Sequence, residues 1–331
     1  MRRYELKIAG TTSATYASQV NGQNDPGALN IEFDVPQYNF AAPIGYAHIK
    51  VWGVSLATIG QGSDFNAATV DLSAGMAPGF PLATLQAPLY GPILHGTVFQ
   101  AYGNWVGLEQ CLILVVTTDG GASISNPANI VVNWPKGTKM ADAVQQTLQT
   151  AYPGYTVNIN ISDLLVLGED EVSQHWTLLQ LGQYLYDTSK SINTDPTYAG
   201  VNISLSGTTI TVQDGTTLPT AIAIRFEDMI GQPTWIGPGM VQVSLVMRSD
   251  ITVGAALTFP QTQQTLSEAQ MGTQPQNKSA FSTGTFSVTA VRSVGNFRHP
   301  DGLNWITVVN AISAPLPANI QDTQALPDNQ S

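Results

Sequence analysis

Val241-Gln-Val-Ser-Leu-Val-Met247 places an apolar side chain at every second position. A period of two is typical of a β-strand that has one face on a core and the other in solvent. Leu29-Asn-Ile-Glu-Phe-Asp-Val35 and Ala47-His-Ile-Lys-Val-Trp52 alternate in the same way, far away in the chain. Strands of this kind in both halves of the sequence predict a mainly β protein.

The N-terminal region is rich in short strand-like stretches. Examples are Val98-Phe-Gln-Ala-Tyr102 and Cys111-Leu-Ile-Leu-Val-Val116, and turn formers such as Asn24-Asp-Pro-Gly27 and Gly60-Gln-Gly62 separate the stretches. Many short strands with frequent turns are typical of an antiparallel barrel or sandwich. We therefore expect a first β module over residues 1–133.

Residues 134–192 show a different pattern, which predicts two helices around a strand. After Thr138, apolar side chains recur on one helical face: Met140, Val144, Leu148 and Ala151. Tyr155-Thr-Val-Asn-Ile-Asn-Ile161 then alternates as a strand. A second helix is expected from Thr177, which forms a capping-box pattern with Gln180. The order helix, strand, helix indicates a small α/β insert.

Residues 193–314 return to strand patterns and predict a second β module. Val201–Leu205 and Thr209–Val212 flank Ser206-Gly-Thr208, which indicates a hairpin. The stretch 261–282 is rich in Gln, Ser and Thr and is expected to be a long loop. Residues 315–331 offer little to bury and are expected to form a flexible tail. The predicted fold is thus two barrel-like antiparallel β modules separated by a small α/β domain.

The composition points to a surface that is covered by other subunits. Only 11 % of the 331 residues are charged, where about 25 % is typical. Charged residues are depleted in the cores of protein interfaces, so we expect hidden faces. The net charge of −11 is spread along the chain and argues against a basic patch for nucleic acid. We expect no signal peptide and no membrane segment.

Motifs that carry chemistry are missing from the sequence, and we expect no enzyme, no metal and no cofactor. The four histidines and the single Cys111 show no zinc-ligand spacing, and Cys111 lies in an apolar setting that suits a buried side chain. Glu169-Asp-Glu171 is the densest acidic cluster. It is either a cation site or a solvated loop whose charge favours the N-terminus of the next helix, and we expect the loop.

The C-terminal half resembles the hub proteins of phage tails, the broad group of baseplate hub and late-control-type proteins. The matching stretch runs from Asp228-Met-Ile-Gly-Gln-Pro-Thr-Trp235 through Val241–Leu257 and closes with Gly284–Val291, Gly295-Asn296 and Trp305–Val309. Ser293 and Asn296 depart from the pattern, where the family often has His and Asp. The resemblance marks structural or interface candidates rather than catalytic ones: Gly231, Pro233, Trp235, Gly254, Gly295 and Trp305.

This resemblance implies a structural virion protein in the tail tip or baseplate. It implies a homotrimer, in which six β modules form a collar that matches a hexameric tail tube. The implied neighbours are the distal tail tube protein, a central fibre or spike protein and the tape measure protein. DNA would pass the lumen without specific binding, because like charge opposes adhesion to phosphate.

Two alternatives stay open at the level of sequence. The chain could be a carbohydrate-binding or receptor-binding tail-tip protein, which should hold an aromatic-lined groove. It could also be a tail enzyme that cleaves glycans, which would need two carboxylates in one cleft. Sequence spacing does not decide between them, because such pairs are assembled in space.

Overall fold

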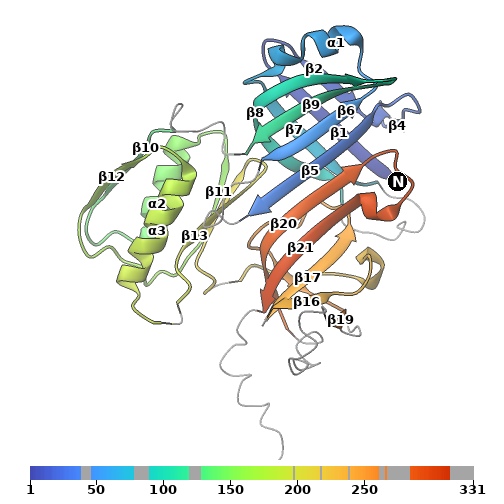
Figure 1. Cartoon of the computed structure of the whole chain (residues 1–331). Helices are drawn as coiled ribbons and strands as arrows, with labels where there is room; N and C mark the ends of the chain where they lie inside the picture. Colours follow the sequence, from blue (N-terminus) through green and yellow to red (C-terminus); the bar gives the residue numbers. More distant parts are fainter. Residues whose placement is uncertain are drawn as a thin grey trace, which may run out of the picture.

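A computed structural model describes residues 1–38, 46–77, 89–118, 128–196, 198–216, 218–237, 239–260, 265–266 and 284–313. The protein is mainly β, as predicted, and has one large, mostly antiparallel sheet beside a smaller α/β unit (Figure 1). The expected tail at 315–331 lies outside the described residues. So does nearly all of the expected loop at 261–282.

The described part of the first β module contains nine strands. They are β1 (Arg2–Ala9), β2 (Ala14–Ala17), β3 (Gln19–Val20), β4 (Gln23–Asn24), β5 (Asn30–Tyr38), β6 (Ala47–Trp52), β7 (Thr69–Met76), β8 (Gly91–Val106) and β9 (Glu109–Thr117). Two short helices that the sequence did not predict, α1 (Leu56–Gly60) and η1 (Gly62–Phe65), join β6 to β7 and pack on β8. Alternating side chains of these strands fill one core.

The α/β unit has three layers (Figure 1). Its elements are β10 (Ile130–Trp134), α2 (Met140–Ala151), β11 (Thr156–Asn160), β12 (Glu171–His175), α3 (Leu178–Ile192), β13 (Asn202–Ser206) and β14 (Thr209–Gln213). The two helices lie between the β10–β12 ribbon and the sheet β11-β14-β13. The predicted cap of α3 is confirmed, because the Thr177 hydroxyl accepts a hydrogen bond from the Gln180 N–H at 3.3 Å.

The second β module follows the α/β unit. It contains β15 (Ile222–Ala223), η3 (Phe226–Asp228), β16 (Thr234–Gly237), β17 (Met240–Val246), β18 (Ala256–Thr258), β19 (Thr265–Leu266), β20 (Phe286–Asn296), η5 (Gly302–Asn304) and β21 (Trp305–Ser313). Strand β20 is bulged between Val288 and Ala290. It pairs with β21 along one edge, and with β18 and then β5 along the other.

The two β modules share one sheet. Its strand order is β19-β16-β17-β21-β20-β5-β6-β9-β8-β7-β1-β2, so the pair β20–β5 joins strands from opposite ends of the chain. Three clusters of buried apolar side chains lie along the molecule, and the first also takes in Met247 and Trp305 from the second module. The two β modules are therefore joined by a shared sheet and a shared core. The predicted module boundaries stay predictions.

Candidate functional site

The pair β5–β20, which we call the seam, is where the two β modules become one body. Seven residue pairs run from Ala290↔Tyr38 to Asn296↔Glu32. On the outer face, the Arg292 guanidinium donates two hydrogen bonds to the Asp34 carboxylate, at 2.8 and 2.5 Å. The two modules are thus joined both by backbone pairing of β5 with β20 and by a bidentate ion pair between the same two strands.

The inner side of the seam brings together two of the predicted structural residues, Gly295 and Trp305. Trp305 is 2 % exposed, and its indole N–H donates to the Gly75 carbonyl at 3.1 Å. Its ring meets the Phe33 ring edge-on, with 5.3 Å between centroids. A side chain at position 295 would overlap the Phe33 ring. Gly295 therefore makes room for an aromatic contact that crosses from one module to the other.

The other predicted residues lie away from the seam. Gly231 has a φ of +85°, the left-handed region that favours glycine, and Pro233 and Trp235 are buried beyond it in the second module. Gly254 has a φ of +89°, and a Cβ there would overlap the side chain of Gln213 in the α/β unit. Gly254 is thus an interface residue between the second module and the α/β unit, whereas Pro233 and Trp235 are buried in the second module and Gly231 is an exposed turn residue.

A buried charged network near the seam was not singled out from the sequence. Arg248 is 4 % exposed and donates to both carboxylate oxygens of Asp250, at 2.7 and 2.6 Å, and to Asp228 at 3.2 Å. Burial lowers the pKa of the Arg248 guanidinium, but the hydrogen bonds and charges of Asp250 and Asp228 outweigh it and raise the pKa above its ordinary value. The only sequence signal was a strand that ends in Arg-Ser-Asp.

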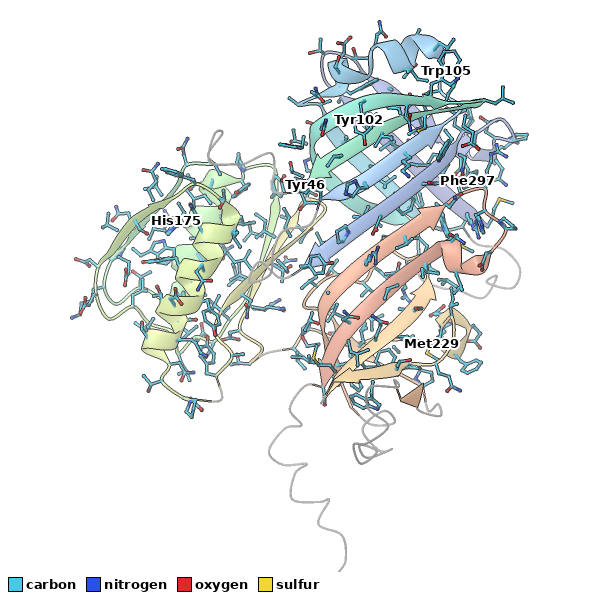
Figure 2. All side chains as sticks on the ribbon, viewed as in Figure 1. Tyr46, Tyr102, Trp105, His175, Met229 and Phe297 are labelled. Atoms are coloured by element: carbon cyan, nitrogen blue, oxygen red, sulfur yellow. The ribbon has the colours of Figure 1, made fainter. Side chains whose placement is uncertain are left out.

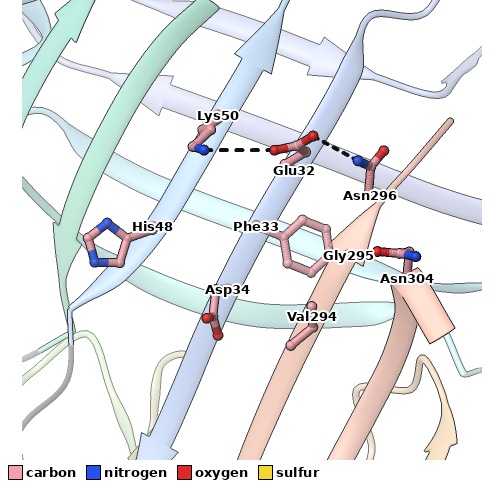
Figure 3. A pocket seen from close by; sticks show the side chains of 9 residues that line it. All are labelled: Glu32, Phe33, Asp34, His48, Lys50, Val294, Gly295, Asn296 and Asn304. Carbon is pink, nitrogen blue, oxygen red and sulfur yellow. Dashed lines mark hydrogen bonds and ion pairs between the residues drawn. The ribbon is translucent and has the colours of Figure 1, made fainter. Parts of the chain in front are cut away.

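An open groove of about 510 Å³ crosses the outer face of the seam (Figure 3). Within it, Glu32 accepts a hydrogen bond from the Asn296 side chain at 2.7 Å and lies 4.0 Å from the Lys50 ammonium. A second groove of about 680 Å³ adjoins it through Glu32 and is lined by Trp52 and Leu108. The two grooves together place polar side chains beside an apolar ledge, by which we mean the surface formed by Trp52 and Leu108. The nine residues around the first groove are Glu32, Phe33, Asp34, His48, Lys50, Val294, Gly295, Asn296 and Asn304.

The two carboxylates of this groove, Glu32 and Asp34, are both held by hydrogen-bond donors. Glycoside cleavage needs one carboxyl group that gives up a proton to the leaving group. Glu32 already accepts from an amide, and Asp34 accepts twice from Arg292. Each carboxylate therefore already has a hydrogen-bond donor.

The histidines stay dispersed in the fold. His48 lines the groove, His95 contacts Asp71 at 2.5 Å, His175 contacts Ser173 at 3.0 Å, and His299 contacts Asn304 at 3.0 Å. Among the described residues, no group of three or more His, Cys, Asp and Glu side chains could hold a metal ion. Cys111 is buried, as expected, and burial raises the pKa of its thiol.

The acidic cluster has a different setting from the one expected. Asp170 accepts from the Lys136 N–H at 2.7 Å, and Glu171 accepts from the Tyr184 hydroxyl at 2.6 Å. Strand β12 begins at Glu171 and separates the cluster from α3. Glu169 and Asp170 are exposed loop residues, as expected. The cluster does not adjoin the N-terminus of α3, because β12 lies between them.

Large apolar side chains are exposed along β8 and the turn after it. Phe99 is 64 % exposed, Tyr102 44 %, Trp105 59 % and Leu108 100 %. Figure 2 labels Tyr102 and Trp105 on this end of the first module. Exposed apolar groups in such density are typical of surfaces that contact other proteins. No helix among the described residues is long and apolar enough to span a membrane.

Comparison with solved structures places the chain among known folds. The 43 kDa tail protein of prophage MuSo2 from Shewanella oneidensis superposes with a TM-score of 0.51 at 9 % identity, over 95 % of this chain and 99 % of that one. A tail protein from Neisseria meningitidis gives a TM-score of 0.48 at 10 % identity, over 94 % and 96 % of the two chains. The Escherichia coli c3393 protein, a type VI secretion component, gives 0.47 at 11 % identity, over 95 % and 79 %. Neither a protein-family model nor the sequence of a curated protein matches this chain.

Proposed function

We propose that this chain is a structural component of a phage-type tail, namely the hub that joins the distal tail tube protein to a central fibre or spike. The observation that carries the proposal is the fold shared with the prophage MuSo2 tail protein over almost the full length of both chains. A match from end to end covers both β modules and the α/β unit together. It therefore supports a common architecture rather than one shared module.

The proposed assembly is a homotrimer in which six β modules form a collar at the tail tip. Its lumen would pass the tape measure protein and DNA during entry into the host cell. The net charge of −11 suits such a passage, because an acidic wall does not adhere to phosphate. The exposed aromatic groups on β8 supply the kind of surface that is enriched in interface cores.

Labelled particles would test this location directly. An affinity tag on the chain, detected by gold-labelled antibody in purified particles, should mark the tail end distal to the capsid. Chemical cross-linking of purified particles should give a covalent species of three times the monomer mass. Label on the capsid, or a chain absent from purified particles, would overturn the proposal.

A second candidate is binding of a carbohydrate in the paired grooves on the outer face. Trp52 and Leu108 offer an apolar ledge, and Asn304, Glu32 and Lys50 offer hydrogen bonds to hydroxyl groups. Electrophoresis in gels that contain host surface polysaccharide should then retard the wild-type chain.

The groove variants Trp52→Ala and Asn304→Ala should migrate freely in the same gels. Trp105→Ala, which lies outside both grooves, should be retarded like the wild type. Equal migration of the wild type with and without polysaccharide would exclude this candidate.

A further inference from the structure

The β10–β12 ribbon leaves one edge of a strand without a partner. Strand β12 pairs with β10 from Ile130↔His175 to Trp134↔Glu171, and among the described residues no strand pairs with its other edge. Figure 1 places β12 at the outer rim of the α/β unit, away from the large sheet. A free edge presents unpaired N–H and C=O groups, and another strand can add to it.

Strand β12 contains no lysine, no proline and no bulge. Native edges are commonly blunted by lysine, proline or a bulge. The outward side chains of β12 are Val172, which is 77 % exposed, and Gln174. Glu171 is on the helix-facing side, where it accepts the hydrogen bond from Tyr184. The solvent face of the ribbon is thus uncharged in a protein whose net charge is −11.

The sequence of β12 is complementary to itself in the antiparallel direction. Ser173 is the central residue of the strand, with the acidic Glu171 two residues before it and the basic His175 two residues after it. Antiparallel pairing about Ser173 places Glu171 of one copy opposite His175 of the other, twice, and Val172 opposite Gln174. Parallel pairing in register would instead oppose Glu171 to itself, and like charges directly opposite one another are destabilising.

We propose that β12 binds β12 of a second copy of this chain, antiparallel and centred on Ser173. Registers centred on Val172 or Gln174 keep the same faces but lose both Glu–His pairs. The ribbon alone is smaller than the roughly 800 Å² per partner of a standard interface, so the dimer is weak and depends on concentration. A two-fold contact cannot repeat around a threefold ring. The dimer is therefore assigned to free chains before assembly, and it does not depend on the proposed tail function.

Cysteine cross-linking tests the register. Paired Cβ atoms in adjacent strands lie about 4.5–5.5 Å apart, close enough for a disulfide after a small adjustment. Ser173→Cys should give a covalent dimer under mild oxidation. Val131→Cys is the control for random collision, because Val131 is 61 % exposed on β10, on the opposite, solvent-facing side of the ribbon. The wild type should stay monomeric on a denaturing gel, since its Cys111 is buried.

Two outcomes would overturn the proposal at this step. One is no covalent dimer from Ser173→Cys, and the other is equally fast cross-linking of Val131→Cys, which would indicate random collision.

A charge placed on the edge provides an independent measurement. Val172→Lys should raise the dimer dissociation constant about tenfold in sedimentation runs over a concentration series, because the two lysines, each opposite Gln174 of the other copy, would be like charges at diagonal positions close to the dyad. Val172 is mostly exposed, so the fold should survive. Val20→Lys, at a position that is 56 % exposed in the first module, should behave like the wild type. An unchanged constant for Val172→Lys would also refute the pairing.

Discussion

Replacing Trp305 by alanine should destabilise both β modules, although the residue belongs to the second. The Trp305 ring is buried in the first cluster of apolar side chains, beside Phe33 and Phe297, at centroid distances of 5.3 and 6.1 Å. Its indole N–H reaches across to the Gly75 carbonyl in β7. The side chain therefore connects β21 to strands at the other end of the sequence.

The expected cost of Trp305→Ala is about 4 kcal/mol in the free energy of unfolding. Truncation of a buried Trp costs about 3–5 kcal/mol through lost transfer energy and the cavity that remains. The lost hydrogen bond adds about 1 kcal/mol, and relaxation around the cavity returns part of the sum. Since a whole domain is stable by only about 5–15 kcal/mol, this loss is large.

Urea unfolding and hydrogen exchange together can check this prediction. The free energy of unfolding should fall by about 4 kcal/mol for Trp305→Ala. It should stay within about 0.5 kcal/mol of the wild type for Trp105→Ala, whose side chain is 59 % exposed. Exchange should accelerate in peptides from β7 as much as in peptides from β21. Faster exchange confined to β20 and β21 would refute the reasoning, because it would mean that the first module does not depend on Trp305.

Three further changes follow from the same region and its surroundings. Gly295→Ala should cost about 1–3 kcal/mol, because the new Cβ would overlap the facing aromatic ring; Gly302→Ala has no atom within 4 Å and should be near neutral by thermal melting. Arg248→Met should cost about 3–5 kcal/mol in urea unfolding, because it removes the charge partner of the buried Asp228 carboxylate and of the partly exposed Asp250. Arg292→Met, at a largely exposed ion pair, should cost less than about 1 kcal/mol. Burial and the hydrogen bond to a carboxylate raise the pKa of Tyr184 to about 12. In the unfolded chain this hydroxyl loses its proton near pH 10. The contribution of the Tyr184 hydroxyl to the free energy of unfolding is therefore complete below pH 10 and is lost between pH 10 and 12. Tyr184→Phe should remove this loss from a curve of stability against pH.

Secondary structure could be predicted from the sequence where the apolar periodicity is clear and where a turn or a capping residue marks the end of the element. The stretch Ala47–Trp52 is a strand with the predicted bounds, and Thr177 caps α3 as predicted. Helix α1 was missed because five residues are too few to show a period. Strand β12 was missed because Glu171-Val-Ser-Gln-His175 has only one apolar side chain. Weak or short patterns fail because tertiary contacts, not local preference, decide their structure.

The seam could not be predicted from the sequence at all. A period of two tells which face of β5 and β20 is buried but not which strand lies beside them. The partners Glu32 and Asn296 are 264 residues apart in the chain. Gly295 and Trp305 were selected one by one, yet their meeting with Phe33 and Gly75 depends on this pairing. Individual candidates were within reach of sequence reasoning, and the site that they form was not.

Two arginines at the Asn296 end of the seam indicate that the β modules move as one body. Arg2 of β1 donates to the carbonyls of Asn296 and Asp301, at 2.9 and 2.6 Å, and Arg298 donates to the Pro26 carbonyl at 2.9 Å. Domain motion normally occurs at linkers that few contacts cross. Here, a hinge between the modules would have to break seven strand pairs and these side-chain bonds together. An interface of this kind suits a protein that transmits force without a hinge between its modules. Any conformational change in the proposed hub should therefore occur between subunits or at the α/β unit rather than across the seam.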